Sequence, residues 1–72
     1  MNQAELENQF KEKLRELFRQ HETISSRYSQ EDFVNKFQIQ YKDGRPHQPV
    51  GPDDVDTETF QKVMAAFNDV YP

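Results

Sequence analysis

The apolar positions of the first quarter of the chain recur with the period of an α-helix. They form one stripe, which neither Gly nor Pro interrupts. This spacing predicts a helix over about residues 3–20, with mixed charges on its other faces. Residues 21–28 lose the period and are predicted to form a connector. The members of the stripe are Leu6, Phe10, Leu14, Leu17 and Phe18.

A second apolar stripe begins after Ser29. Ser29 with Asp32 three residues later has the form of a capping box, in which Asp replaces the usual Glu or Gln. The pattern therefore predicts a second helix, over about residues 30–41. The apolar residues on its face are Phe33, Val34, Phe37 and Tyr41.

The C-terminal part of this second helix has an alternative. Residues 37–41 also alternate with period two, and the pair Asp43-Gly44 is typical of tight hairpin turns. Pro46 and Pro49 argue against a second strand, because proline has no N–H to donate to a ladder. The sequence thus favours a helix to about residue 41, with a minor β-hairpin around 38–48 as the alternative.

Residues 44–56 are predicted to form a long loop, because they hold three of the four prolines and both glycines. A third helix is predicted over about 57–70. Asp56 or Thr57 can cap it. Its apolar stripe consists of Phe60, Val63, Met64 and Phe67.

Together these patterns predict a mainly α fold, with three helices in a single small domain that spans residues 1–72. Hydrophobic residues make up 33% of the chain, against roughly 45–50% in ordinary globular proteins. The core must therefore be thin, and we expect marginal stability that a partner or self-association (a homo-oligomer) would increase. The predicted core consists of Phe10, Leu14, Leu17, Phe37, Phe60, Val63 and Phe67.

The net charge of −4 comes entirely from residues 51–72. Residues 1–28 hold five acids and five bases, and residues 29–50 hold three of each. The last segment has five acids and only one base, Lys62. Acidic side chains at this place can guide a basic partner, and they also suit the positive end of a helix dipole. Those beside the predicted helix start are Asp53, Asp54, Asp56 and Glu58.

The sequence offers no apparatus for catalysis or for metal binding. It has no cysteine, no Gly-rich phosphate loop and no nucleophile beside a histidine. His21 and His47 are far apart in the sequence and are predicted to lie on the surface. A calcium loop starting at Asp54 fails because Thr59 and Ala65 occupy the positions of the essential Gly and Glu. We therefore expect no catalytic residue, no metal and no cofactor.

Nucleic-acid binding has one candidate surface, a ridge formed by Lys11, Arg15 and Arg19 at four-residue spacing on the first helix. Acidic neighbours and a pI of about 5.0 disfavour it. The alternative function is nevertheless a helix-turn-helix or winged-helix DNA-binding regulator, because the predicted helices and hairpin follow one another in the order that such proteins have. No apolar run approaches the roughly 18 residues of a membrane span, and the N-terminus lacks the features of a signal peptide. We expect a cytoplasmic protein without a membrane partner.

These exclusions favour a small, acidic, non-enzymatic regulator or adaptor that binds a larger protein through a basic surface. Many small phage- or plasmid-encoded regulators and bacterial adaptors share this size, acidity and lack of catalytic residues, which is an analogy of size and charge and not of motif. Inhibition or modulation of a larger host complex, such as the transcription machinery, is one specific form of this function. The candidate partner-binding residues are Asp53, Asp54, Asp56, Glu58, Arg45 and His47.

Overall fold

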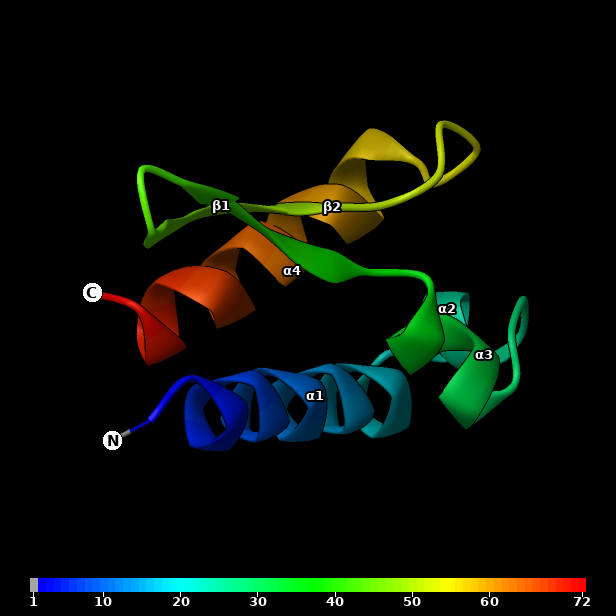
Figure 1. The fold of residues 1–72 in the computed structure, drawn as a ribbon. Helices are drawn as coiled ribbons and strands as arrows, with labels where there is room; N and C mark the ends of the chain where they lie inside the picture. Colours follow the sequence, from blue (N-terminus) through cyan, green and yellow to red (C-terminus); the bar gives the residue numbers. More distant parts are fainter. Residues whose placement is uncertain (1) are drawn as a thin grey trace.

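The computed structural model describes residues 2–72, which form four helices and one antiparallel β-hairpin (Figure 1). A mainly α fold with a minor hairpin is therefore confirmed. None of the helices in the described range is long and apolar enough to span a bilayer. In chain order the elements are α1 (Gln3–Gln20), α2 (Glu22–Ser25), α3 (Gln30–Asn35), β1 (Gln38–Lys42), β2 (Arg45–Val50) and α4 (Thr57–Val70).

The two long helices and the hairpin are stacked on one another. In Figure 1 the hairpin lies above α4 and α1 lies below it, while α2 and α3 cover one end of α1. The helices α1 and α4 run in opposite directions in this view, which brings the two ends of the chain to the same side. The stripes of α1, α3 and α4 thus face a common interior.

The interior contains most of the predicted core. Of the seven expected residues, Leu17 and Phe60 are only partly buried, and the other five are buried. The predicted connector 21–28 contains the one-turn helix α2, whose Ile24 is fully buried. The rings of Phe10 and Phe67 meet edge-on, with centroids 6.3 Å apart, and join α1 to α4. The buried apolar residues are Phe10, Leu14, Ile24, Phe33, Val34, Phe37, Val63, Ala66, Phe67 and Val70.

Each helix of six residues or more begins at a side-chain cap. Asn2 Oδ1 accepts a hydrogen bond from the Glu5 amide at 2.9 Å. Ser29 Oγ accepts one from the Asp32 amide, so the predicted cap of α3 is confirmed. Asp56 rather than Thr57 caps α4. Such caps satisfy amide groups that a helix leaves unpaired at its N-terminus.

The second helix is shorter than the sequence favoured. The stretch predicted as helix over 30–41 leaves the helical conformation after Asn35, and the alternative hairpin forms instead. Its turn has positive φ at both central residues, 54° at Asp43 and 76° at Gly44. These values are those of a type I′ turn, whose twist matches that of the flanking strands.

The prolines of β2 do not disrupt the ladder because of their register. Pro46 lies opposite Tyr41 and Pro49 opposite Ile39, with an irregularity between Gln40 and Tyr41. Hydrogen-bonded and non-hydrogen-bonded pairs alternate from the pair that closes the two-residue turn. Both prolines therefore occupy non-hydrogen-bonded pairs, where the missing N–H would point away from β1.

Candidate protein-binding surface

The acidic segment before α4 is divided between two roles. Asp56 is held by the fold: Oδ2 accepts from the Thr59 amide at 3.0 Å, and Oδ1 accepts from the Thr59 hydroxyl at 2.8 Å. Arg27 Nη1 lies 3.1 Å from Asp56 Oδ1 and ties the turn before α3 to the start of α4. The hydrogen bonds from Thr59 hold the pKa of Asp56 below its ordinary value.

Glu58 also has a partner within its own helix. Lys62 Nζ lies 3.2 Å from Glu58 Oε1, at the i,i+4 spacing that stabilises helices. Asp56 and Glu58 are thus used, at least in part, to start α4.

Asp53 and Asp54, unlike Asp56 and Glu58, lie before the cap of the helix. They occupy a tight turn in which the Val55 amide donates a hydrogen bond to the Pro52 carbonyl at 3.3 Å. Both side chains are exposed. Neither makes a hydrogen bond or ion pair with the part of the chain that the structure describes. These two carboxylates are available to groups outside the chain.

An open pocket of about 360 Å³ lies beside Asp53. Val50 is 37% exposed, an unusual value for a large apolar residue in this molecule. We call this region the loop surface. It comprises Asp53 and Asp54 together with the pocket-lining residues Val50, Pro52, Val55 and Phe60.

Arg45 and His47 lie away from the loop surface. Both belong to the end of β2 that is next to the turn, where they line a separate hollow of about 450 Å³ with Lys42 and Asp43. Figure 1 places this turn and the loop after β2 at opposite ends of the hairpin. The structure therefore brings the predicted acidic residues together and separates them from Arg45 and His47.

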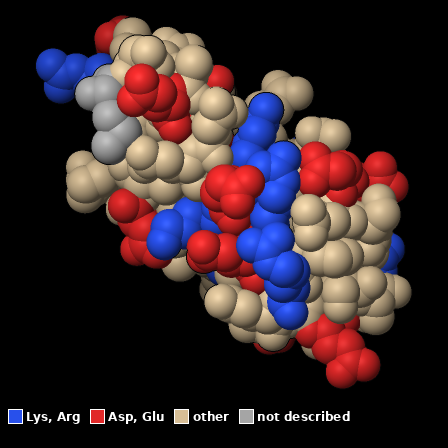
Figure 2. Space-filling view, turned by 90° about the horizontal axis from the view of Figure 1, so that it is seen from below, with Lys and Arg blue, Asp and Glu red and all other residues tan. Residues whose placement is uncertain are grey.

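The basic ridge of α1 is engaged in ion pairs at its centre. Arg15 Nε and Nη2 each lie 3.1 Å from an oxygen of Glu31, and Arg15 Nη1 lies 2.7 Å from Glu12 Oε1. The hydrogen bonds from Arg15 lower the pKa of Glu31. Lys11 and Arg19 are exposed on either side. In Figure 2, which views the molecule from below, acidic and basic side chains lie next to one another on this face.

Two tyrosines join the helices to the hairpin at its turn end. The Tyr41 hydroxyl donates a hydrogen bond to Glu7 Oε2. The pKa of Tyr41 is raised, chiefly by burial and to a lesser extent by this hydrogen bond. The Tyr71 ring packs on Phe67 with centroids 4.8 Å apart. Its hydroxyl is buried beside the hydroxyl of Tyr41, and burial, followed by the charge of Glu7, raises its pKa.

The described residues contain no group of three His, Asp or Glu side chains arranged as metal ligands. His47 is exposed and His21 is half-buried at the junction of α1 and α2. Comparisons of the chain with protein-family models, with curated proteins and with solved structures gave no match.

Sequence reasoning identified the acidic residues and missed the apolar part of the loop surface. Val50, Pro52 and Val55 lie outside any periodic stripe. Their exposure depends on the path of the chain between β2 and α4, which no local pattern specifies. The Pro- and Gly-rich composition predicted a loop over residues 44–56, which is wrong for residues 45–50, because they pair with β1 as strand β2. The prediction is right for residues 51–56, which include part of the loop surface.

Proposed function

We propose that this chain is a non-enzymatic protein-binding module that docks a basic partner through the loop surface. One contrast carries this function. Within a single acidic segment, Asp56 and Glu58 are paired inside the chain, while Asp53 and Asp54 have no partner there. The cap and the i,i+4 pair of α4 account for the first pair of carboxylates, whereas no contact within the described chain engages the second pair.

The chemistry of the partner follows from the neighbours of the two free carboxylates. Val50, Pro52 and Phe60 supply an apolar hollow next to Asp53. Protein interfaces commonly combine an apolar centre with a charged rim. A segment that carries an apolar side chain flanked by Lys or Arg complements this arrangement.

DNA binding, the alternative, has weaker support. Arg15 at the centre of the basic ridge is already paired with Glu12 and Glu31. Helix α3, which would have to serve as the recognition helix, has only six residues and buries Phe33 and Val34. Proteins that bind nucleic acid need a continuous basic footprint.

The more specific predictions remain proposals. A regulator or adaptor that inhibits or modulates a larger complex would act by occupying a basic surface of that complex. An origin in a phage or plasmid and an action on the transcription machinery are further predictions, which depend on identifying the partner.

Affinity capture with the immobilised chain tests protein binding. We expect one stoichiometric protein to be retained after nuclease treatment, and to be retained less by the variant Asp53→Asn/Asp54→Asn. The matched control is Glu5→Gln/Glu16→Gln, which removes the same charge from exposed positions of α1. Equal retention by the two double variants would contradict the role of the loop surface, and retention that nuclease abolishes would favour the DNA-binding alternative.

A further inference from the structure

The two edges of the hairpin differ in their ability to accept another strand. In a two-stranded sheet each strand has one free edge. On β2, the prolines at positions 46 and 49 stand where a residue would direct its N–H outward. Proline at these positions removes the donors that an incoming strand needs, a common protection of sheet edges.

The edge of β1 has no such protection. The same alternation of pairs directs the N–H and C=O groups of Ile39 and Tyr41 away from β2. No backbone hydrogen bond joins either residue to a helix or loop within the described chain. This edge therefore presents two unpaired donors and two unpaired acceptors, the pattern that strand addition uses.

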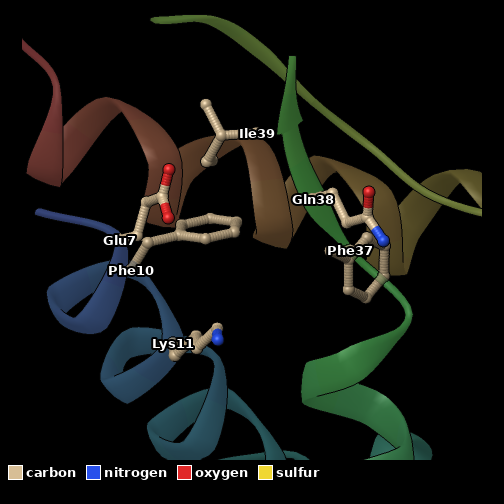
Figure 3. A pocket seen from close by; sticks show the side chains of 6 residues that line it. All are labelled: Glu7, Phe10, Lys11, Phe37, Gln38 and Ile39. Carbon is tan, nitrogen blue, oxygen red and sulfur yellow. The ribbon is translucent and has the colours of Figure 1, made fainter. Parts of the chain in front are cut away.

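A pocket of about 280 Å³ lies beside this edge, between β1 and α1 (Figure 3). Phe10 of α1, Phe37 and Ile39 provide its apolar walls, and the side chains of Glu7 and Lys11 lie at its α1 side. This pocket suits a single large side chain from a strand that runs along β1.

The charges of the pocket are unequally engaged. The Glu7 carboxylate accepts the hydrogen bond from Tyr41. Lys11 is exposed, and no salt bridge joins it to a residue that the structure describes, although its charge contributes to the lowered pKa of Glu31. A carboxylate on the incoming segment would complement this ammonium group.

We propose that β1 binds an extended segment of a partner protein by strand addition. An apolar side chain of that segment enters the pocket between α1 and β1, and a neighbouring carboxylate meets Lys11. This surface shares no residue with the loop surface, so its existence does not depend on the proposed function.

A second copy of this chain is a poorer occupant. Its β1 would offer the sequence Gln-Ile-Gln-Tyr-Lys, which contains no carboxylate and would bring Lys42 toward a surface that already holds Lys11. In addition, helix α1 of the second copy would come close to helix α1 of the first copy, because each α1 lies beside its own β1. A lone extended segment needs only the strand spacing of about 4.8 Å.

Selection from a displayed library of random peptides tests the proposal. The peptides are about nine residues long, within the usual length of a strand, and the bait is the full chain. We expect selected peptides that carry an apolar residue close to an acidic one. In NMR spectra, a synthetic peptide of the selected sequence should shift the amides of Ile39 and Tyr41 and slow their hydrogen exchange. A selection without binders, or shifts confined to other elements, would overturn the proposal.

Two changes separate the backbone contribution from that of the charge. The chain is short enough for total synthesis, so that the Ile39 amide nitrogen can be methylated; this removes an outward donor and leaves the ladder with β2 intact. Loss of one hydrogen bond should weaken the selected peptide by about three- to tenfold. Lys11→Gln should weaken it as well, whereas Lys13→Gln on another face of α1 should not.

Unchanged affinity after methylation would overturn strand addition, and unchanged affinity of Lys11→Gln would overturn the assignment of the carboxylate. Thermal unfolding of each protein shows that it is folded. Sedimentation of the free chain tests whether a second copy occupies this edge. A dimer in which the Ile39 and Tyr41 amides are protected from hydrogen exchange would assign the edge to a second copy and overturn the proposal.

Discussion

The helices and the segment 38–56 of this molecule are stabilised by different kinds of contact. The long helices and α3 are joined by buried aliphatic and aromatic side chains. In segment 38–56, Pro49 is the one buried residue. The hairpin is held mainly by backbone pairing, a tight turn and the bond from Tyr41 to Glu7, while Pro49 and Ile39 pack on the helices. The helical part thus supplies most of the stability, and the other part exposes groups that a partner can contact.

Truncation of an apolar side chain should change the free energy of unfolding far more in the helical part than in segment 38–56. Phe67→Ala should lower the free energy of unfolding by about 3–5 kcal/mol, because it leaves a cavity beside Phe10. Val50→Ala, at an exposed position of β2, should change it by about 0.5 kcal/mol or less. Urea unfolding monitored by circular dichroism measures both. Equal losses would contradict the division between the two parts.

Gly51 packs tightly against the ring of Phe37. A Cβ atom at this position would lie 2.7 Å from two ring carbons of Phe37, which is buried in the core. Gly51→Ala should therefore cost about 1–3 kcal/mol through overpacking. Gly44→Ala meets no atom within 4 Å and is strained only by its positive φ of 76°, a cost of about 1–2 kcal/mol.

Replacement of Gly44 by Asn distinguishes these causes, since Asn tolerates a positive φ. Gly44→Asn should recover most of the stability that Gly44→Ala loses, whereas Gly51→Asn should be no better than Gly51→Ala. Recovery at both positions would show that the packing of Phe37 against Gly51 is loose. Urea unfolding of the four variants makes this comparison.

The two tyrosines between the helices and the hairpin should respond unequally to loss of the hydroxyl. Tyr41→Phe leaves Glu7 without its donor and should cost about 1 kcal/mol. Tyr71→Phe removes a buried hydroxyl that interacts with the Tyr41 hydroxyl, and should cost less than Tyr41→Phe. A larger loss for Tyr71→Phe than for Tyr41→Phe would contradict the hydrogen bonding described here.

The cap of α4 predicts a small dependence of stability on pH. The pKa of Asp56 is lower in the folded chain than its ordinary value of 3.8, so the unfolded chain binds a proton first as the pH falls. Asp56 therefore stabilises the fold at neutral pH, and this contribution disappears as the pH drops from about 3.8 through the lowered pKa. The difference in stability between the wild type and Asp56→Asn should shrink over this range. Urea unfolding of both proteins at neutral and at acidic pH measures this difference, and a constant difference would contradict the role of Asp56 as a cap.

The sequence predicted the helical part of the molecule well and segment 38–56 less well. The stripes of α1 and α4 specify long helices because each apolar residue has neighbours three and four positions away. Residues 37–41 satisfied two periods at once, and the choice between helix and strand depended on pairing with residues 45–50, which a local pattern does not contain. Pro46 and Pro49 argued against a strand until the register showed that they occupy non-hydrogen-bonded pairs. The acidic residues were visible in the sequence, but their division into paired and free carboxylates required the position of Thr59 and Arg27.

The central claim is that Asp53 and Asp54 serve a partner, whereas Asp56 serves the fold. The most direct test is the association rate of the captured partner with the wild type and with Asp53→Asn/Asp54→Asn, at low and at physiological ionic strength. Charges at the rim of an interface act mainly on the association rate, and salt screens them over about 8–10 Å. We predict slower association and a flatter salt dependence for the double variant, with unchanged urea unfolding. Identical salt slopes for the two proteins would contradict the claim and leave the acidic segment with a role in helix α4 alone.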